Sequence, residues 1–354
     1  MEPTPNKSSS LPSTHPASKV APPTTLDEAF SRVFSTKALE PFNDWFIGYC
    51  SPLKDPLTAR RQVSYRRYLV GLSGVQPREG MRVLDAGCGF GPNCIAFYLM
   101  GFREIHGLDL FQPMVDQLER YLPHLGLDPF ISVRQGDVCD LTSIYGKKFF
   151  DLIFSNEALS HYHDPDEFLR QAHLALKPGG VFIVSDNNNG ANRRIRRLNQ
   201  EIWNRFENGP PGCVGIHTVK ESYVEMRRRI ISESFPELDE ATAAGFARST
   251  FRMNREEILD AVRRWREGGE KPANRYRPGV CPLNPETNQT IEELFDPARL
   301  ARQLKQVGFR DARAYAYLGG ATRGGLAAQI NNLWRILSPI TMRFSNAFSA
   351  IGWK

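Results

Sequence analysis

The sequence predicts an α/β fold, with a doubly wound, mostly parallel sheet and a largely helical cap inserted after the fifth strand. Two observations carry this prediction. Between residues 77 and 186, short apolar runs alternate with segments of helical periodicity, and such alternation implies parallel strands joined by right-handed crossovers. The alternation stops over residues 187–294 and resumes over residues 295–318, which is the pattern of an insertion into one sheet domain.

Two segments precede the sheet. Residues 1–25 are rich in Pro, Ser and Thr and poor in large apolar side chains, so we expect a disordered tail there. Residues 26–76 repeat apolar side chains at helical spacing, with Pro41, Pro52 and Pro56 as breaks. This pattern predicts short N-terminal helices that lead into the core.

The predicted strands are short apolar runs, most of which end at a polar or acidic residue. In chain order they read MRVLDAG, REIHGLDL, FISVRQGD, FFDLIFSN and VFIVSD. The segments PNCIAFYLMG, QPMVDQLERYLPHLG and DPDEFLRQAHLALKPGG are predicted helices, and Pro178 with its following glycine pair stops the last of them. The carboxyl ends of the strands therefore carry the candidate polar groups.

The inserted block, residues 187–294, contains NNNGANRRIRRLNQEIWNRF, KESYVEMRRRIISESF and NREEILDAVRRW. Its helical periodicity predicts a cap over the sheet. After it, FDPARLARQLKQVGF is a predicted helix with Asp296 as N-cap and Pro297 at its first position, and RDARAYAY is a predicted strand. Residues 319–354 are predicted as a C-terminal helical segment.

Composition narrows the classes of function. The formal net charge of +6 weakly favours anionic partners, although a solvated basic surface explains it equally simply. Six cysteines without a C-x-x-C pair suggest neither a zinc site nor a disulfide framework, so we expect a reducing, cytoplasmic location and no metal. The first residues lack the apolar core of a signal peptide, and no apolar run is long enough to span a membrane.

The stretch VLDAGCGFG at residues 83–91 predicts a strand that enters a ligand-binding turn. Free backbone N–H groups face a ligand at such a turn, and glycines let that ligand approach closely. A dinucleotide fingerprint starting at Gly87 requires a glycine where this chain has Pro92. Asp85 would repel a pyrophosphate but suits a ligand that carries a cationic amine.

At this point the sequence resembles the class I S-adenosylmethionine-dependent methyltransferases, whose first motif is an acid followed by G-x-G-x-G. The resemblance covers roughly residues 60–186 and 295–318, and it implies S-adenosylmethionine as the cofactor. It also implies that Asp109 accepts the ribose hydroxyls, and that Asp137 receives the adenine amino group while Val138 packs on the ring. The cofactor-binding residues expected are Asp85, Gly87, Gly89, Gly91, Asp109, Leu110, Asp137, Val138 and Asn156.

The carboxyl end of the fourth strand is where the resemblance places the reactive methyl group. The chain reads N-E-A-L from Asn156, and this departs from the motif of enzymes that methylate exocyclic amines of nucleic acids. Glu157 and His161 are the catalytic candidates, since a histidine accepts a proton readily near neutral pH. A structural role for His161 and for His163 stays open, because methyl transfer needs a base only when the acceptor must lose a proton.

Selection of the acceptor is expected to fall to the cap and the N-terminal helices. The cap carries large aromatic residues, among them Trp203, Phe206, Tyr223, Phe246, Phe251, Trp265 and Tyr276. They suit either an apolar acceptor pocket or the cap's own small core. We therefore expect a methyltransferase acting on a small organic acceptor, with lipid-like and aromatic compounds as candidates. The alternatives are an RNA methyltransferase and a catalytically silent cofactor-binding regulator, and nucleic acid is the less favoured partner.

The C-terminus departs from the family pattern. After RDARAYAY the family adds a strand antiparallel to the rest, but here AAQINNLWRILSPITMRFSNAF follows and the chain stops at IGWK. We expect that strand to be missing or to lie beyond residue 354. The apolar, Arg-containing helix suits a membrane surface, another subunit or packing on the cap.

Overall fold

The computed structural model describes residues 25–39, 42–215, 217–317 and 325–354. Residues 1–24 of the predicted disordered tail lie outside the described residues. Within the described ranges, no helix is both long and apolar enough to cross a bilayer.

A seven-stranded sheet forms the centre of the fold, with strand order β3-β2-β1-β4-β5-β9-β8. All strands run parallel except β9, which pairs antiparallel with both of its neighbours. Their bounds are β1 Arg82–Ala86, β2 Glu104–Asp109, β3 Ile131–Gln135, β4 Phe150–Asn156, β5 Leu176–Asp186, β8 Asp311–Tyr317 and β9 Ala347–Trp353. The predicted doubly wound α/β fold is therefore confirmed.

The expectation of a missing last strand was wrong. Strand β9 is AFSAIGW near the end of the chain, and it lies between β5 and β8 with its five central residues buried. Small side chains dominate it, so its hydrophobic signal is weak. Gly352 shows why: a Cβ there would lie 2.9 Å from the ring of Phe309. The sheet core thus also includes residues that the sequence assigned to a C-terminal helical segment.

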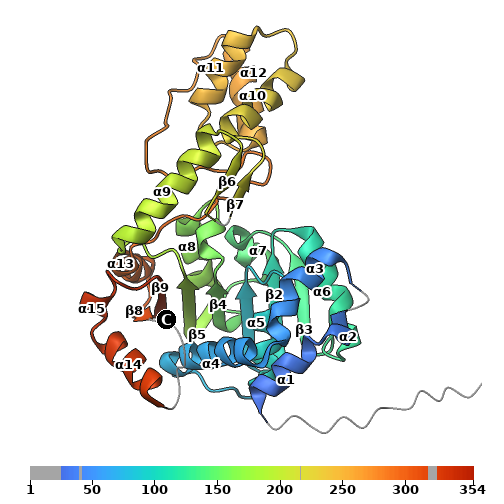
Figure 1. The fold of residues 1–354 in the computed structure, drawn as a ribbon, viewed down its shortest axis with the longest axis vertical. Helices are drawn as coiled ribbons and strands as arrows, with labels where there is room; N and C mark the ends of the chain where they lie inside the picture. Colours follow the sequence, from blue (N-terminus) through green and yellow to red (C-terminus); the bar gives the residue numbers. More distant parts are fainter. Residues whose placement is uncertain (1–24, 40–41, 216, 318–324) are drawn as a thin grey trace, which may run out of the picture.

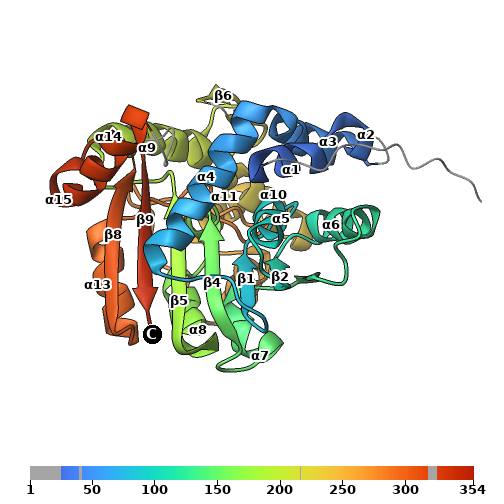
Figure 2. The ribbon, with the colours of Figure 1, turned by 90° about the horizontal axis from the view of Figure 1, so that it is seen from below.

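Helices cover both faces of the sheet (Figure 2). One face carries α4 (Pro56–Ser73), α5 (Pro92–Leu99) and α6 (Gln112–His124), with α1 (Leu26–Val33), α2 (Thr36–Leu39), α3 (Asp44–Cys50) and η1 (Ser51–Lys54) beyond them. The other face carries α7 (Leu141–Tyr145), α8 (Pro165–Ala175) and α13 (Pro297–Val307), and short turns η2 (Val138–Asp140) and η3 (Leu159–His161) follow β3 and β4. Each face buries its own apolar cluster.

The predicted N-cap of α13 is confirmed. The carboxylate of Asp296 accepts hydrogen bonds from the backbone N–H groups of Ala298 and Arg299, at 2.9 and 3.0 Å, and Pro297 occupies the first helical position. Helix α13 packs on β8 and β9, so this local signal positions the edge of the sheet.

The insertion after β5 projects away from the sheet as an elongated lobe (Figure 1). Its elements are α9 (Arg193–Asn208), β6 (Gly212–Val214), β7 (His217–Val219), α10 (Tyr223–Ser234), α11 (Glu240–Ser249) and α12 (Arg255–Arg266). Helices α10–α12 enclose a separate apolar cluster that includes Ile230, Phe246 and Val262. We call residues 209–275 the tip of the insertion. The chain then returns to the sheet through an irregular segment.

Candidate cofactor and acceptor cleft

A cleft of about 790 Å³ opens at the carboxyl ends of the central strands. Its walls come from α3, α4, the turn after β1, the ends of β2 to β5, and residues 287–292 of the returning segment. Seven of the nine predicted cofactor residues line it: Gly87, Gly89, Asp109, Leu110, Asp137, Val138 and Asn156. Both predicted catalytic residues, Glu157 and His161, also line it. Neither Asp85 nor Gly91 belongs to its wall.

The three glycines of the turn have different physical reasons. All have positive φ, which glycine adopts without strain. A Cβ at Gly87 would lie 2.5 Å from that of Ala158, and one at Gly91 would lie 2.6 Å from the Leu118 side chain. At Gly89 the nearest atom would be the sulfur of Met114, at 3.7 Å. Gly87 and Gly91 therefore serve close packing, and only Gly89 leaves open space for a ligand.

Asp85 lies behind the turn and has no exposed surface. Its Oδ1 accepts a hydrogen bond from Asn93 Nδ2 at 3.0 Å, and Asn93 Oδ1 accepts one from the Arg66 guanidinium at 2.6 Å. Burial raises the pKa of Asp85 to about 7, although Asn93, Cys94 and Arg66 oppose the shift. Asp85 therefore does not reach the cleft itself, whereas Asn93 and Arg66 do line it.

The Asp109 carboxylate holds the glycine turn in place and also lines the cleft. Its Oδ2 accepts the backbone N–H of Gly89 at 2.8 Å, and its Oδ1 accepts that of Phe111 at 2.9 Å, just before α6. The carboxylate therefore holds the glycine turn against the end of β2. Each oxygen keeps a second lone pair, which leaves Asp109 able to accept ligand hydroxyls from the cleft.

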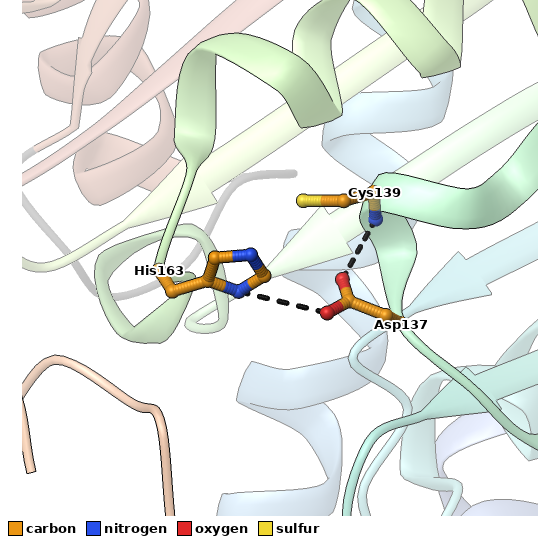
Figure 3. A group of neighbouring side chains, drawn as sticks. All are labelled: Asp137, Cys139 and His163. Carbon is orange, nitrogen blue, oxygen red and sulfur yellow. Dashed lines mark hydrogen bonds and ion pairs between the residues drawn. The ribbon is translucent and has the colours of Figure 1, made fainter. Parts of the chain in front are cut away.

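Asp137, Cys139 and His163 form a compact group (Figure 3). Asp137 Oδ1 accepts the backbone N–H of Cys139 at 2.8 Å, and Oδ2 lies 3.6 Å from His163 Nδ1. The potential ligand atoms of the three residues lie within 4.8 Å of one another, a spacing that a metal ion could use. Burial, followed by the charge of Asp137, raises the pKa of the Cys139 thiol well above its usual value. Asp137 holds this group together through its contacts with the Cys139 backbone and the His163 ring.

His161 presents a defined tautomer. Its Nδ1 lies 3.2 Å from the carbonyl oxygen of Thr290, and a carbonyl can only accept, so Nδ1 carries the proton. In the neutral ring Nε2 is then an acceptor, and no described residue pairs with it. The Thr290 backbone N–H in turn donates to the His161 carbonyl. The returning segment of the insertion therefore orients this ring.

Acidic groups surround His161. Burial, and then the charge of Asp186, raises the pKa of Glu157, whose Oε1 accepts a hydrogen bond from Asn187 Nδ2 at 2.6 Å. Glu157 also has φ of 53°, in the left-handed region that non-glycine residues rarely adopt. Burial likewise raises the pKa of Asp186. The end of the cleft near β4 and β5 thus favours groups that donate hydrogen bonds.

Five residues of the N-terminal helices line the cleft without having been predicted from the sequence: Trp45, Tyr49, Leu53, Gln62 and Arg66. Arg66 is 4% exposed and points its guanidinium toward Asn93. A buried arginine on a helix otherwise apolar on that face was the available signal, but SYRRYLVGL contains two adjacent arginines and does not tell them apart. Trp45 and Tyr49 stay 44% and 50% exposed at the mouth of the cleft.

None of the Phe, Trp and Tyr residues that the structure describes in the insertion lines the cleft. Several pack on one another instead, as in the pairs Phe206–Tyr223 and Phe246–Trp265. The insertion reaches the cleft only through residues 187–188 at its start and through Thr287–Asn288–Gln289 and Glu292 near its end. We call residues 287–292 the strap. Trp203 Nε1 donates to the Glu292 carbonyl at 3.2 Å and ties the strap to α9.

Comparisons with known proteins agree with this geometry. A sequence model described as a methyltransferase domain matches residues 77–231. The ubiquinone biosynthesis O-methyltransferase of Caulobacter sp. (strain K31) is 30% identical over 188 residues, which cover 51% of this chain and 70% of that protein. The chain belongs to the class I S-adenosylmethionine-dependent methyltransferases.

Two further proteins are also similar to this chain. Sterol 24-C-methyltransferase erg6 of Aspergillus fumigatus is 29% identical over 170 residues, or 46% of this chain, and the match spans only 44% of that relative's length. The crystal structure of an S-adenosylmethionine-dependent methyltransferase from Mesorhizobium loti covers 82% of this chain and 98% of its own, with 17% identity and a TM-score of 0.42.

The described residues fit the cofactor of this methyltransferase family. S-adenosylmethionine carries a positive charge, an amino acid end and an adenosine. Here the turn is open at Gly89, Asp109 and Asp137 present carboxylates to the cleft, and Arg66 supplies a cation for a carboxylate. These features fit S-adenosylmethionine, the cofactor that the sequence predicts. The role of each single residue stays a prediction.

Proposed function

We propose that this chain transfers a methyl group from S-adenosylmethionine to a small organic acceptor bound in the cleft. One observation carries the proposal: the open glycine turn and a histidine whose Nδ1 faces the Thr290 carbonyl line the same cavity, which leaves the Nε2 of that histidine available to an acceptor. The cofactor supplies a methyl group that is already activated by a sulfonium. The protein's own contribution is then to orient the reactants, exclude water and, where needed, accept a proton.

The cofactor residues have distinct roles in this proposal. Asp109 accepts the ribose hydroxyls with the lone pairs that its backbone contacts leave free, and Asp137 accepts the adenine amino group beside Val138. Arg66 binds the cofactor carboxylate, and Asp85 complements its ammonium through Asn93. This assignment is supported by the order of these residues along the cleft wall, from the turn after β1 to the end of β3.

The acceptor has a polar head and an apolar body. Asn187, Asn188 and the strap supply amide and carboxylate groups inside the cleft, whereas Trp45 and Tyr49 offer aromatic surface at its mouth. The relatives' names, which refer to a sterol and to ubiquinone biosynthesis, support a lipid-like or aromatic acceptor. When the acceptor atom carries a proton, His161 Nε2 takes it as the new bond to carbon forms.

The test of this role is His161→Asn. The asparagine amide still donates to the Thr290 carbonyl but offers no basic nitrogen, so we expect kcat to fall by about 100-fold or more with the cofactor Kd unchanged. Release of S-adenosylhomocysteine is measured with a panel of hydroxylated sterols and ubiquinone-biosynthesis intermediates, and with cell extract. His163→Asn is the matched control, and it should raise the cofactor KM while leaving kcat intact.

Two results would contradict the proposal. Equal kcat values for the wild type and the His161→Asn variant would show that His161 does not act as the base. Tight cofactor binding without product release, from any acceptor or extract, would favour the silent regulatory alternative.

A further inference from the structure

The C-terminal helices expose an unusual amount of apolar surface. Helices α14 (Gly325–Ile336) and α15 (Ser338–Thr341) lie at the edge of the sheet beside β8 (Figures 1 and 2). Seven large apolar side chains on or next to them are 43% to 72% exposed: Leu326, Ile330, Leu333, Ile336, Leu337, Ile340 and Phe344. These seven residues define what we call the apolar stripe.

The stripe follows helical geometry. Six of its members are spaced by alternating steps of four and three residues, from Leu326 to Phe344. Such spacing places side chains on one face of a helix. Scattered exposed apolar residues are ordinary in soluble proteins, but a continuous row of them marks a surface that binds something.

The face of α14 and α15 toward the protein carries both apolar and polar contacts. Trp334 and Met342 pack on the apolar cluster that α8 and α13 also contact. Ser338 Oγ accepts the backbone N–H of Ala316 on β8 at 2.9 Å. Thr341 Oγ1 donates to the Trp334 carbonyl at 2.7 Å, a bond within the C-terminal segment itself. Turning the stripe toward the sheet would break the Ser338–Ala316 bond and expose Trp334 and Met342.

The charges around the stripe favour one kind of partner. Residues 325–354 contain no Asp or Glu. Of their three cations, Arg335 lies over the ring of Tyr315 and Lys354 donates to backbone carbonyls of α8 and β5, which leaves Arg343 as the cation next to the stripe. Arg343 is exposed beside Phe344. A second copy of the chain, packed symmetrically through the stripe, would bring equal positive charges together across the interface. A surface that combines an apolar layer with negative headgroups matches both features.

We propose that α14 and α15 dock on the surface of a lipid bilayer that contains anionic headgroups, with the apolar stripe facing the acyl chains. The proposal goes beyond the methyltransferase function and does not depend on it. Docking of this kind lies in the plane of the membrane and needs no spanning segment.

Co-sedimentation of the full chain with phosphatidylcholine vesicles, with and without phosphatidylglycerol, tests the proposal. We expect binding to the phosphatidylglycerol vesicles that weakens as salt is raised. The variant Ile336→Glu/Ile340→Glu should lower the partition coefficient more than tenfold, since two apolar anchors are replaced by negative charges. Both side chains are about two-thirds exposed, so the fold should tolerate the change. Arg343→Gln should lower the partition coefficient about fivefold.

A matched control is Leu198→Glu, which places the same charge on α9, where Leu198 is 46% exposed. It should bind vesicles like the wild type. The proposal is overturned if the wild type does not sediment with anionic vesicles, or if the control loses as much binding as the stripe variant. A wild-type dimer that the stripe variant converts to a monomer, without vesicle binding, would assign the stripe to a second copy instead.

Discussion

Asp85 has no exposed surface, and it meets the cleft through Asn93, which donates to it and lines the cleft. Burial raises its pKa from 3.8 to about 7. Without ligand, a raised carboxyl pKa contributes stability that is complete at pH below the unfolded value and is lost as pH rises through about 7. A cationic ligand reverses this preference, since it favours the ionised carboxylate.

We therefore expect the affinity for S-adenosylmethionine to increase as pH rises toward about 7 and to level off above it. One linked proton limits the change to about tenfold per pH unit. Asp85→Asn keeps the hydrogen-bonding shape but cannot ionise, and its affinity should vary less over the same range. Calorimetric titrations measure the affinity of the wild type and of the Asp85→Asn variant from about pH 5.5 to about pH 8, in steps of about half a pH unit. Parallel pH profiles in the two proteins would show that Asp85 is not the coupled group.

At the scale of elements, one buried ion pair holds the insertion's helices together. The side chain of Arg227 on α10 has no exposed surface, and its guanidinium pairs with Glu207 on α9, which is 5% exposed. Arg227 Nε also donates to the Ala247 carbonyl of α11 at 2.7 Å. The pair thus joins three helices beside the apolar cluster that α10–α12 enclose.

Arg227→Met should destabilise the insertion by about 3–5 kcal/mol, because it leaves the Glu207 carboxylate buried without its partner. Hydrogen exchange of the α10 and α11 amides measures this local free energy. Replacing both partners, as in Glu207→Leu/Arg227→Met, should recover a large part of the loss. Arg228→Met is the control, since Arg228 is 39% exposed in its pair with Glu225 and should change stability by less than ~1 kcal/mol. Equal losses of stability in the Arg227→Met and Arg228→Met variants would mean that burial of the Arg227–Glu207 pair does not change its contribution to stability.

At the scale of the whole molecule, the insertion divides into parts with different relations to the cleft. The strap lines the cleft and orients His161, whereas the tip packs on itself away from the sheet (Figure 1). The two ends of the tip lie close together, since Asn208 Nδ2 donates to Tyr276 Oη at 3.2 Å. The tip contacts the strap through His217, whose Nε2 lies 3.7 Å from Glu292 Oε1, but none of its described residues lines the cleft.

Replacing residues 209–275 with a short Gly-Ser linker should leave the cofactor Kd within about twofold of the wild type, because distant sites contribute independently. Turnover should also persist, since the strap and His161 remain. Replacing residues 187–294 should abolish turnover while cofactor binding remains. Calorimetry and S-adenosylhomocysteine release measure both variants, after gel filtration confirms that they are monodisperse. Loss of turnover after replacement of residues 209–275 would indicate that the aromatic residues of the tip select the acceptor.

Most of the fold followed from local chemistry that the sequence displays. Apolar runs that end at Asp109 or Asn156 and the N-cap at Asp296 each act within a few residues, so their outcome is readable without the tertiary structure. The same holds for the glycine turn, because positive φ is a local property of Gly87, Gly89 and Gly91. The sequence alone thus determined six of the seven strands of the sheet, the turn and the cofactor class.

Only the tertiary structure decided which distant segments meet. Strand β9 pairs with β5 and β8 through backbone hydrogen bonds. Its small side chains give only a weak strand pattern in the sequence. Arg66 reaches the cleft because α4 packs across the sheet. Ser338 on α15 faces the sheet, where its Oγ accepts the backbone N–H of Ala316. These contacts depend on burial and on pairing between residues far apart in the chain. Sequence periodicity reports which side chains share a face, and packing decides what that face touches.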